Sequence, residues 1–250
     1  MWVIAIAVVI YTAICLLLYA SQRNMMYLPT PEVTAVNADS FRLESDGEKL
    51  KIWRFGAGPD ALVYFGGNAE DVAWNIPAFS AYFPNHTNYL VNYRGYGGSS
   101  GSPSEAGLFK DALALFDNLR VQHGKISVIG RSLGGGVAAY VASRRDVHKL
   151  VLVTPFDSAL NMARKLYPLF PVTLLLKDQY DTAGLAGKIS APVLVIIAGQ
   201  DGIVPRSRSD ALVEAFHADQ ISLTVLENVG HNSIDDSPGY TAALSAFLND

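Results

Sequence analysis

Short apolar runs alternate with helical stretches along most of the chain, and this order is the strongest constraint on its fold. Several runs are almost continuously apolar, which is typical of parallel strands buried on both faces. Their alternation with helix candidates predicts an α/β fold whose parallel sheet is covered on both sides. The first strands have no helix between them, so we expect an antiparallel start. The expected strands are 49–55, 61–65, 88–93, 125–130, 149–154, 192–198 and 221–226, and the expected helices are 69–82, 104–123, 133–145, 205–218 and 238–248.

Residues 2–20 form an uncharged apolar run at the N-terminus. A helix needs about 20 apolar residues to cross the hydrocarbon core of a bilayer, and aromatic side chains near both ends of this run fit the membrane interfaces. A cleaved signal peptide and a wholly soluble chain are the alternatives. Against the signal peptide, no Lys or Arg precedes the run, and the run is longer than a usual signal core. We therefore expect residues 1–22 to be a single-pass anchor in a plasma or inner membrane, followed by one domain, 23–250.

Charge and cysteine content restrict the partners of the chain. The net charge is −4, without the basic footprint of a nucleic-acid-binding protein. The only cysteine, Cys15, lies in the apolar run, so no disulfide framework or thiolate metal cluster is expected, and no dinucleotide or phosphate-loop motif indicates a cofactor. Arg23 follows the run and favours a cytoplasmic domain by the positive-inside rule, but a single arginine leaves the side of the membrane open. The oligomeric state is also open.

A longer apolar segment, 158–190, interrupts the alternation of strands and helices. It separates two expected strands by more residues than a single helix needs. Ligands of open α/β sheets bind beyond the carboxyl ends of the strands, so this insertion could cover such a site as a small cap. A helix pair that only completes the core is an equal alternative.

Ser132 lies where an expected strand gives way to an expected helix, within the sequence Gly130-Arg131-Ser132-Leu133-Gly134. A G-x-S-x-G motif in this context is typical of a nucleophile elbow, in which a tight turn presents the serine hydroxyl. The start of the helix behind the serine also favours developing negative charge. The alternative is a structural glycine turn with an incidental serine. The strand and the helix on either side favour Ser132 as a nucleophile.

A serine nucleophile needs a histidine base and a carboxylate that orients the base. His231 follows an expected strand on a loop at the carboxyl edge, whereas His148 and His217 are expected on the surface. Asp201 follows the strand before that one, and the order Ser, Asp, His is the order found in one class of hydrolases. Asp157 is the alternative acid, although a position beside a helix N-cap is its more ordinary role.

Two backbone N–H groups must face the oxyanion of the tetrahedral intermediate. We expect one from Leu133, directly after the nucleophile. The other is expected from the loop that follows strand 61–65, with Asn68 as the donor and Ala69 as the neighbouring alternative. Asn68 could also cap the next helix, and the two roles are compatible.

Together, these motifs resemble an α/β-hydrolase subgroup that includes membrane-anchored hydrolases, serine-aminopeptidase-like proteins and protein depalmitoylases. The resemblance implies a mostly parallel central sheet of about eight strands with helices on both faces. Relatives commonly carry His where this chain has Gly66, which bears on the rigidity of the oxyanion loop. Arg94 is expected to tie loops together. The motifs are 66–69, 92–99, 130–135, 199–205 and 230–232.

The resemblance implies a serine hydrolase that cleaves an ester or thioester through an acyl-enzyme on Ser132. A small-molecule or lipid-like acyl substrate suits both the anchor and the apolar insertion. A peptidase or amidase that uses the same three residues is the alternative, and such an enzyme often carries an acidic patch for the substrate amine. A non-catalytic binding scaffold is a third hypothesis, against which the intact Ser132, Asp201 and His231 argue.

Overall fold

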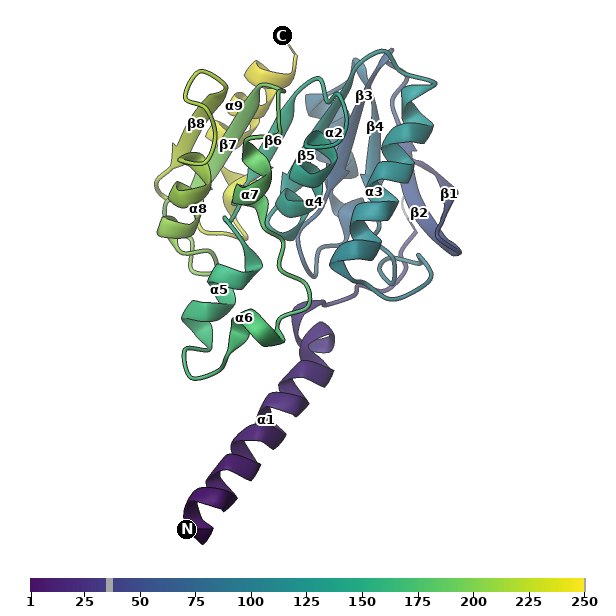
Figure 1. Ribbon diagram of the computed structural model, residues 1–250. Helices are drawn as coiled ribbons and strands as arrows, with labels where there is room; N and C mark the ends of the chain where they lie inside the picture. The colour runs from purple at the N-terminus through teal and green to yellow at the C-terminus, as the bar shows by residue number, and fades with distance from the viewer. Residues whose placement is uncertain (35–37, 250) are drawn as a thin grey trace.

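The computed structural model describes residues 1–34 and 38–249. Within them, eight strands form one sheet in the order β1-β2-β4-β3-β5-β6-β7-β8 (Figure 1). β1 pairs with β2, and β2 with β4, in antiparallel fashion, and every other pair is parallel. The expected antiparallel start and mostly parallel sheet are therefore confirmed. The strands are β1 (Asp39–Ser45), β2 (Glu48–Phe55), β3 (Asp60–Phe65), β4 (His86–Val91), β5 (Ile126–Arg131), β6 (Leu150–Val153), β7 (Val193–Ala198) and β8 (Ile221–Leu226).

Helices cover both faces of the sheet because the central strands are apolar on both sides. In β3, Val63 and Phe65 belong to one buried cluster, and Leu62 and Tyr64 belong to the other. Residues of α3, α4, α7 and α8 pack in the first cluster, and residues of η1, α2 and α9 pack in the second. These helices are η1 (Val72–Asn75), α2 (Ile76–Tyr82), α3 (Glu105–Arg120), α4 (Leu133–Ala142), α7 (Thr182–Ala186), α8 (Arg206–Val213) and α9 (Pro238–Leu248), and the short η2 (Ile234–Asp236) precedes α9.

The expected helix 69–82 begins later than its sequence pattern indicates. Residues 66–71 form a loop, and the Asp71 side chain then accepts a hydrogen bond from the Ala73 N–H at the start of η1. The Glu70 carboxylate instead accepts a hydrogen bond from the Gly67 N–H at 2.6 Å. Glu70 thus closes the loop rather than continuing a helix. The expected helix 205–218 is also shorter, since α8 ends at Val213.

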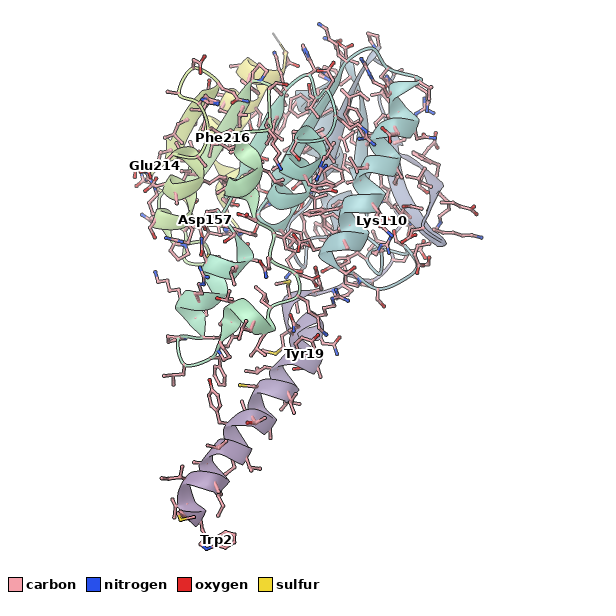
Figure 2. All side chains as sticks on the ribbon, in the orientation of Figure 1. Trp2, Tyr19, Lys110, Asp157, Glu214 and Phe216 are labelled. Carbon is pink, nitrogen blue, oxygen red and sulfur yellow. The ribbon has the colours of Figure 1, made fainter. Side chains whose placement is uncertain are left out.

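The carboxyl ends of the parallel strands share one edge of the sheet, and two features project beyond this edge (Figure 1). The chain after β6 forms α5 (Ala159–Leu166) and α6 (Val172–Leu175), which extend away from the sheet before α7 packs back against α4. The helix α1 (Trp2–Met26) leaves the domain on the same side. Figure 2 shows Trp2 at the far end of α1 and Tyr19 close to the domain.

The C-terminal end of α1 is hydrogen-bonded to the end of α6 and to the chain that follows it. Arg23 donates two hydrogen bonds to the Asp178 carboxylate, at 2.8 and 3.0 Å. Gln22 donates to the Leu175 carbonyl at 3.0 Å and accepts from the Lys177 N–H at 2.7 Å. By length and composition, α1 is able to cross a membrane. The polar contacts of Gln22 and Arg23 hold this end of α1 beside α6.

Candidate active site

Ser132 occupies a tight turn between β5 and α4. Its φ of 52° and ψ of −113° are unusual for a residue with a side chain, and such strain persists only where the surroundings impose it. The glycines on either side leave room for the turn. A Cβ at Gly130 would lie 2.3 Å from the Gly134 carbonyl oxygen, and a Cβ at Gly134 would lie 2.1 Å from the Phe65 carbonyl oxygen. The G-x-S-x-G spacing therefore reflects close contact between β5, α4 and the end of β3.

His231 lies between Ser132 and Asp201. The distance from its Nε2 to Ser132 Oγ is 3.0 Å, and the distance from its Nδ1 to Asp201 Oδ2 is 2.7 Å. An ionised carboxylate only accepts hydrogen bonds, so Nδ1–H must donate to Asp201, which leaves Nε2 to accept the proton of the serine hydroxyl. The structure thus brings together the three side chains that the sequence selected, in the geometry of a nucleophile, a base and an orienting acid.

Asp201 is held by its own loop as well as by His231. Its Oδ1 accepts hydrogen bonds from the N–H groups of Ile203 at 2.8 Å and Val204 at 2.7 Å. Burial alone would raise the pKa of Asp201. The hydrogen bonds from His231 and from the two backbone groups outweigh burial and hold the pKa below its ordinary value. Asp201 therefore stays ionised at neutral pH and fixes the orientation of the imidazole.

This pKa shift predicts how stability responds to acid. A carboxyl whose folded pKa lies below its unfolded value of about 3.9 stabilises the fold fully above that value, and the stabilisation is lost as the pH falls through the folded pKa. The stability difference between wild type and Asp201→Asn, measured by urea unfolding in detergent, should shrink as the pH falls below about 4. A difference that grows as the pH falls from about 4 to about 3 would contradict the ionised, hydrogen-bonded state of Asp201.

Asp157, the alternative acid, is engaged elsewhere. Its Oδ2 accepts hydrogen bonds from Arg208 at 3.0 Å and Asn161 at 2.7 Å, and the neighbouring Ser158 caps α5. His148 and His217 are exposed, as expected from the sequence. The contacts of Asp157 are therefore those of a residue that supports the start of α5.

The loop after β3 lies directly beside Ser132. A Cβ on Gly67 would lie 3.8 Å from the Ser132 Cβ, and Asn68 and Leu133 line the same pocket as Ser132. Within the residues that the structure describes, the N–H groups of Leu133 and Asn68 have no hydrogen-bond partner. Both groups are thus available to an oxyanion above Ser132. The Ala69 N–H also has no partner among the described residues, but Ala69 does not line the pocket, so the pocket favours Asn68 as the second donor.

The Asn68 side chain does not have the helix-capping role that the sequence also allowed. It does not cap a helix, because Asp71 occupies the N-cap position of η1. Its amide donates to the Met26 carbonyl at 2.7 Å and accepts from the Leu28 N–H at 3.0 Å. The oxyanion loop is therefore joined to the end of α1, which the sequence alone did not indicate.

An apolar pocket of about 500 Å³ lies over Ser132. One wall comes from α1, another from α5, α6 and the chain around them, and the floor carries Ser132 and Leu133. The described residues that line it include no aspartate, glutamate, lysine or arginine. The lining residues are Leu18, Gln22, Met25, Met26, Asn68, Ser132, Leu133, Phe156, Ala159, Met162, Ala163, Leu166, Tyr167, Phe170, Val172, Leu175, Leu176, Tyr180 and Ile203.

Comparison with known proteins places the fold within a family. The alpha/beta hydrolase fold model matches residues 60–185. The uncharacterized protein Rv2307c of Mycobacterium tuberculosis is 35% identical over 99% of this chain and 94% of its own. The chain belongs to the α/β-hydrolase fold family. Family membership supports hydrolysis as its general class of activity.

Two further proteins resemble this α/β-hydrolase. The uncharacterized membrane protein YNL320W of Saccharomyces cerevisiae is 28% identical over 88% of this chain and 80% of its own. The solved esterase Pf2001 of Pyrococcus furiosus superposes with a TM-score of 0.70 at 18% identity, covering 89% of this chain and 97% of the esterase. At 18% identity, the superposition supports a shared fold and nothing more specific.

Glu70 and Arg131 support the site of this α/β-hydrolase, and the sequence patterns did not single them out. Besides Gly67, the Glu70 carboxylate accepts hydrogen bonds from Tyr64 at 2.6 Å and Asn75 at 2.7 Å. Arg131 lies 3.9 Å from Glu70 and donates to the His231 carbonyl at 3.2 Å. One largely buried network therefore connects the oxyanion loop with the loop that carries the base. Its only sequence signal is a charged residue beside each glycine motif.

The loop with Gly66 in place of the usual histidine is held by other groups. Tyr93 donates a hydrogen bond to the Gly66 carbonyl at 2.7 Å, and Glu70 fixes the next residue, Gly67. Arg94 donates to both oxygens of the buried Asp111 on α3, at 2.7 and 2.6 Å. Arg94 thereby ties the turn after β4 to α3, the loop-tying role expected of it.

Proposed function

We propose that this α/β-hydrolase is a serine hydrolase that cleaves esters or thioesters of apolar acyl groups. The observation that carries the proposal is the hydrogen-bonded chain Ser132–His231–Asp201 at the floor of an apolar pocket. The contacts of each of these three residues fit one catalytic role. Ser132 is the nucleophile, His231 is the base and Asp201 keeps the base oriented.

In the proposed reaction, Ser132 Oγ attacks the acyl carbonyl carbon while its proton passes to His231 Nε2. The N–H groups of Leu133 and Asn68 stabilise the oxyanion that forms on the carbonyl oxygen. The bond to the leaving alcohol or thiol then breaks, and the leaving group takes the proton from Nε2–H. Water attacks the resulting acyl-Ser132 by the same route in reverse, which releases the carboxylic acid and restores the serine.

The pocket favours an acyl ester over a peptide with a free amine. A substrate ammonium group would need a carboxylate partner, since burying an unpaired charge is costly. The described pocket lining supplies none, and its side chains are almost all aliphatic or aromatic. A medium or long acyl chain would gain about 0.8 kcal/mol per buried methylene in such surroundings.

We further propose that α1 anchors the enzyme in a membrane and that α5 and α6 form a cap over the site. The length of α1 and its lack of charge before Arg23 support the anchor, and a relative is named a membrane protein. Residues of α1, α5 and α6 line the pocket together. The anchor would then also be one wall of the substrate site.

A fluorophosphonate probe tests the nucleophile. The full-length enzyme in detergent should become labelled, and Ser132→Ala should not. Equal labelling of Ser132→Ala would refute the assignment of the nucleophile, and an unlabelled wild type with intact folding would favour the binding-scaffold hypothesis.

A pocket-filling substitution tests the acyl site. Met162 lies in the pocket wall, so Met162→Trp should remove space for several methylenes. The ratio of kcat/KM for a decanoyl ester to that for an acetyl ester should fall at least about tenfold, given the free energy of burying each methylene. Val121→Trp, at an exposed position at the end of α3, is the control and should keep the wild-type ratio. An unchanged ratio in Met162→Trp would mean that the acyl chain lies elsewhere.

A further inference from the structure

An uncharged and largely exposed segment, Leu166–Leu176, runs from the last residue of α5 to the residue after α6, and we call it the cap loop. Its eleven residues read Leu-Tyr-Pro-Leu-Phe-Pro-Val-Thr-Leu-Leu-Leu. Leu166, Leu169 and Leu174 are 67%, 81% and 82% exposed, respectively. Several large aliphatic side chains left in water on one short segment are unusual in a soluble protein, and such a patch marks an interaction surface.

The cap loop contacts α1 halfway along that helix. Tyr11 donates a hydrogen bond to the Leu169 carbonyl at 2.9 Å, and the Tyr11 ring stacks on Phe170 with a centroid distance of 5.8 Å. Tyr11 precedes Arg23, the first charged residue of α1, by about 18 Å along the helix axis. Even with α1 tilted by about 40°, about 14 Å of this distance would lie along the bilayer normal. A bilayer that surrounds the uncharged part of α1 therefore also reaches the cap loop.

The backbone of the cap loop is suited to a medium without water, in which every unpaired N–H group is costly. Pro168 and Pro171 have no N–H group. The N–H groups of Phe170 and Val172 donate within the loop, at 3.1 and 2.8 Å, and Leu174 donates to the Pro171 carbonyl at 2.9 Å. These contacts leave few backbone N–H groups of the loop without a partner among the described residues, and the hydrogen bond from Tyr11 also satisfies the Leu169 carbonyl.

Basic side chains flank the cap loop on both sides. Arg164 and Lys165 precede it and Lys177 follows it, and all three are exposed. The Lys177 ammonium lies 3.9 Å from the centre of the Tyr19 ring, near the domain end of α1. An apolar segment between basic residues fits a membrane interface, where cations meet anionic headgroups while apolar side chains enter the acyl region.

We propose that the cap loop inserts into the same lipid bilayer that α1 spans, so that the pocket over Ser132 opens towards the acyl chains of the membrane. The partner of this surface is thus a lipid bilayer, and the substrates it favours are acyl groups already dissolved in it. The proposal rests on the anchoring role of α1 proposed above. It deepens the proposed function, because the pocket lies between α1 and the cap and Ser132 lies at its floor.

Site-specific fluorescence quenching tests the insertion. The full-length chain carries Leu169→Cys and Cys15→Ala, bears an environment-sensitive dye and is placed in lipid nanodiscs that contain phosphatidylcholine and phosphatidylglycerol. Val121→Cys is the matched control. Val121 is 86% exposed and lies between the end of α3 and the start of β5, at the edge of the sheet opposite the cap loop. Leu174→Cys is a second probe of the loop that guards against a local effect of the dye.

A nitroxide on the lipid acyl chain should quench the dye at positions 169 and 174 several-fold more than a water-soluble nitroxide does, and position 121 should show the reverse order. If the two loop positions behave like position 121, the loop lies in water and the proposal fails. If neither quencher reaches them, a second copy of the chain or another protein covers the loop, which also overturns the proposal.

An activity measurement links the insertion to the substrate. Leu169→Asp/Leu174→Asp changes two exposed positions outside the pocket lining. The ratio of turnover of a decanoyl ester held in the nanodisc to that of a soluble acetyl ester should fall about tenfold, because charged side chains are costly in the acyl region. An unchanged ratio would contradict substrate entry from the bilayer. If wild type cleaves neither ester, the proposed function fails, while the quenching experiment still reports the depth of the loop.

Discussion

Replacing His231 by alanine is expected to lower kcat for an acetyl ester by roughly 10⁴- to 10⁶-fold, as loss of the base does in other enzymes with this arrangement. The reason is that His231 Nε2 lies 3.0 Å from Ser132 Oγ and no other described group bonds to that hydroxyl. Steady-state kinetics of the detergent-solubilised enzyme measures the effect. His217→Ala is the matched control, because His217 is exposed and lies between α8 and the start of β8, at the edge of the sheet opposite the site. It should keep wild-type activity.

A near-normal rate in His231→Ala would remove His231 from the reaction. The same experiment separates base catalysis from folding. His231→Ala should retain the unfolding transition of a folded domain while losing turnover, since the imidazole is a small part of the buried surface. A large loss of activity in His217→Ala as well would point to a general loss of structure rather than to the base.

Two neighbouring glycines are expected to respond to alanine in opposite directions. A Cβ at Gly134 would lie 2.1 Å from the Phe65 carbonyl oxygen and 2.7 Å from that of Gly66. These are backbone atoms at the start of the oxyanion loop and have little room to move. Gly134→Ala should therefore lower the free energy of unfolding by about 3 kcal/mol or more, and should displace the oxyanion loop in any protein that still folds.

Gly135 is the matched control for this prediction. A Cβ there would lie 3.6 Å from Pro155, which is ordinary van der Waals contact, and Gly135 lies in the first turn of α4. Gly135→Ala should raise the free energy of unfolding by up to about 1 kcal/mol, because alanine is the better helix former. Urea unfolding in detergent, followed by tryptophan fluorescence, measures both variants. Equal effects at the two positions would contradict the packing of α4 against β3.

The fold was predictable because its signals are local and repeated. Apolar runs such as 193–198, with helices between them, predicted a parallel sheet. The glycine motifs lie at or shortly after the ends of strands. Ser132, Asp201 and His231 could be selected because carboxyl ends of parallel strands share one edge. Their contact also needs the loops after β7 and β8 to reach back towards Ser132, because β6 and β7 lie between β5 and β8 in the sheet.

Other parts of the site depend on contacts that no local pattern carries. Asn68 bonds to the end of α1, about forty residues earlier in the chain, and Arg131 joins the His231 loop to Glu70. The late start of α2 has the same origin, because the Glu70 carboxylate bonds back to Gly67 in place of a helical turn. Contacts between side chains of different loops cannot be read from the sequence, because they depend on how the folded sheet places those loops next to each other.

Direct detection of the acyl-enzyme is the sharpest test of the central claim. The full-length enzyme is mixed with a decanoyl thioester, quenched in acid within the first turnovers, digested and analysed by mass spectrometry. We expect the decanoyl group on the peptide that carries Ser132, and no adduct on that peptide in Ser132→Ala. Release of the thiol with the acyl group on another residue, or with no covalent adduct at any quench time, would contradict the account.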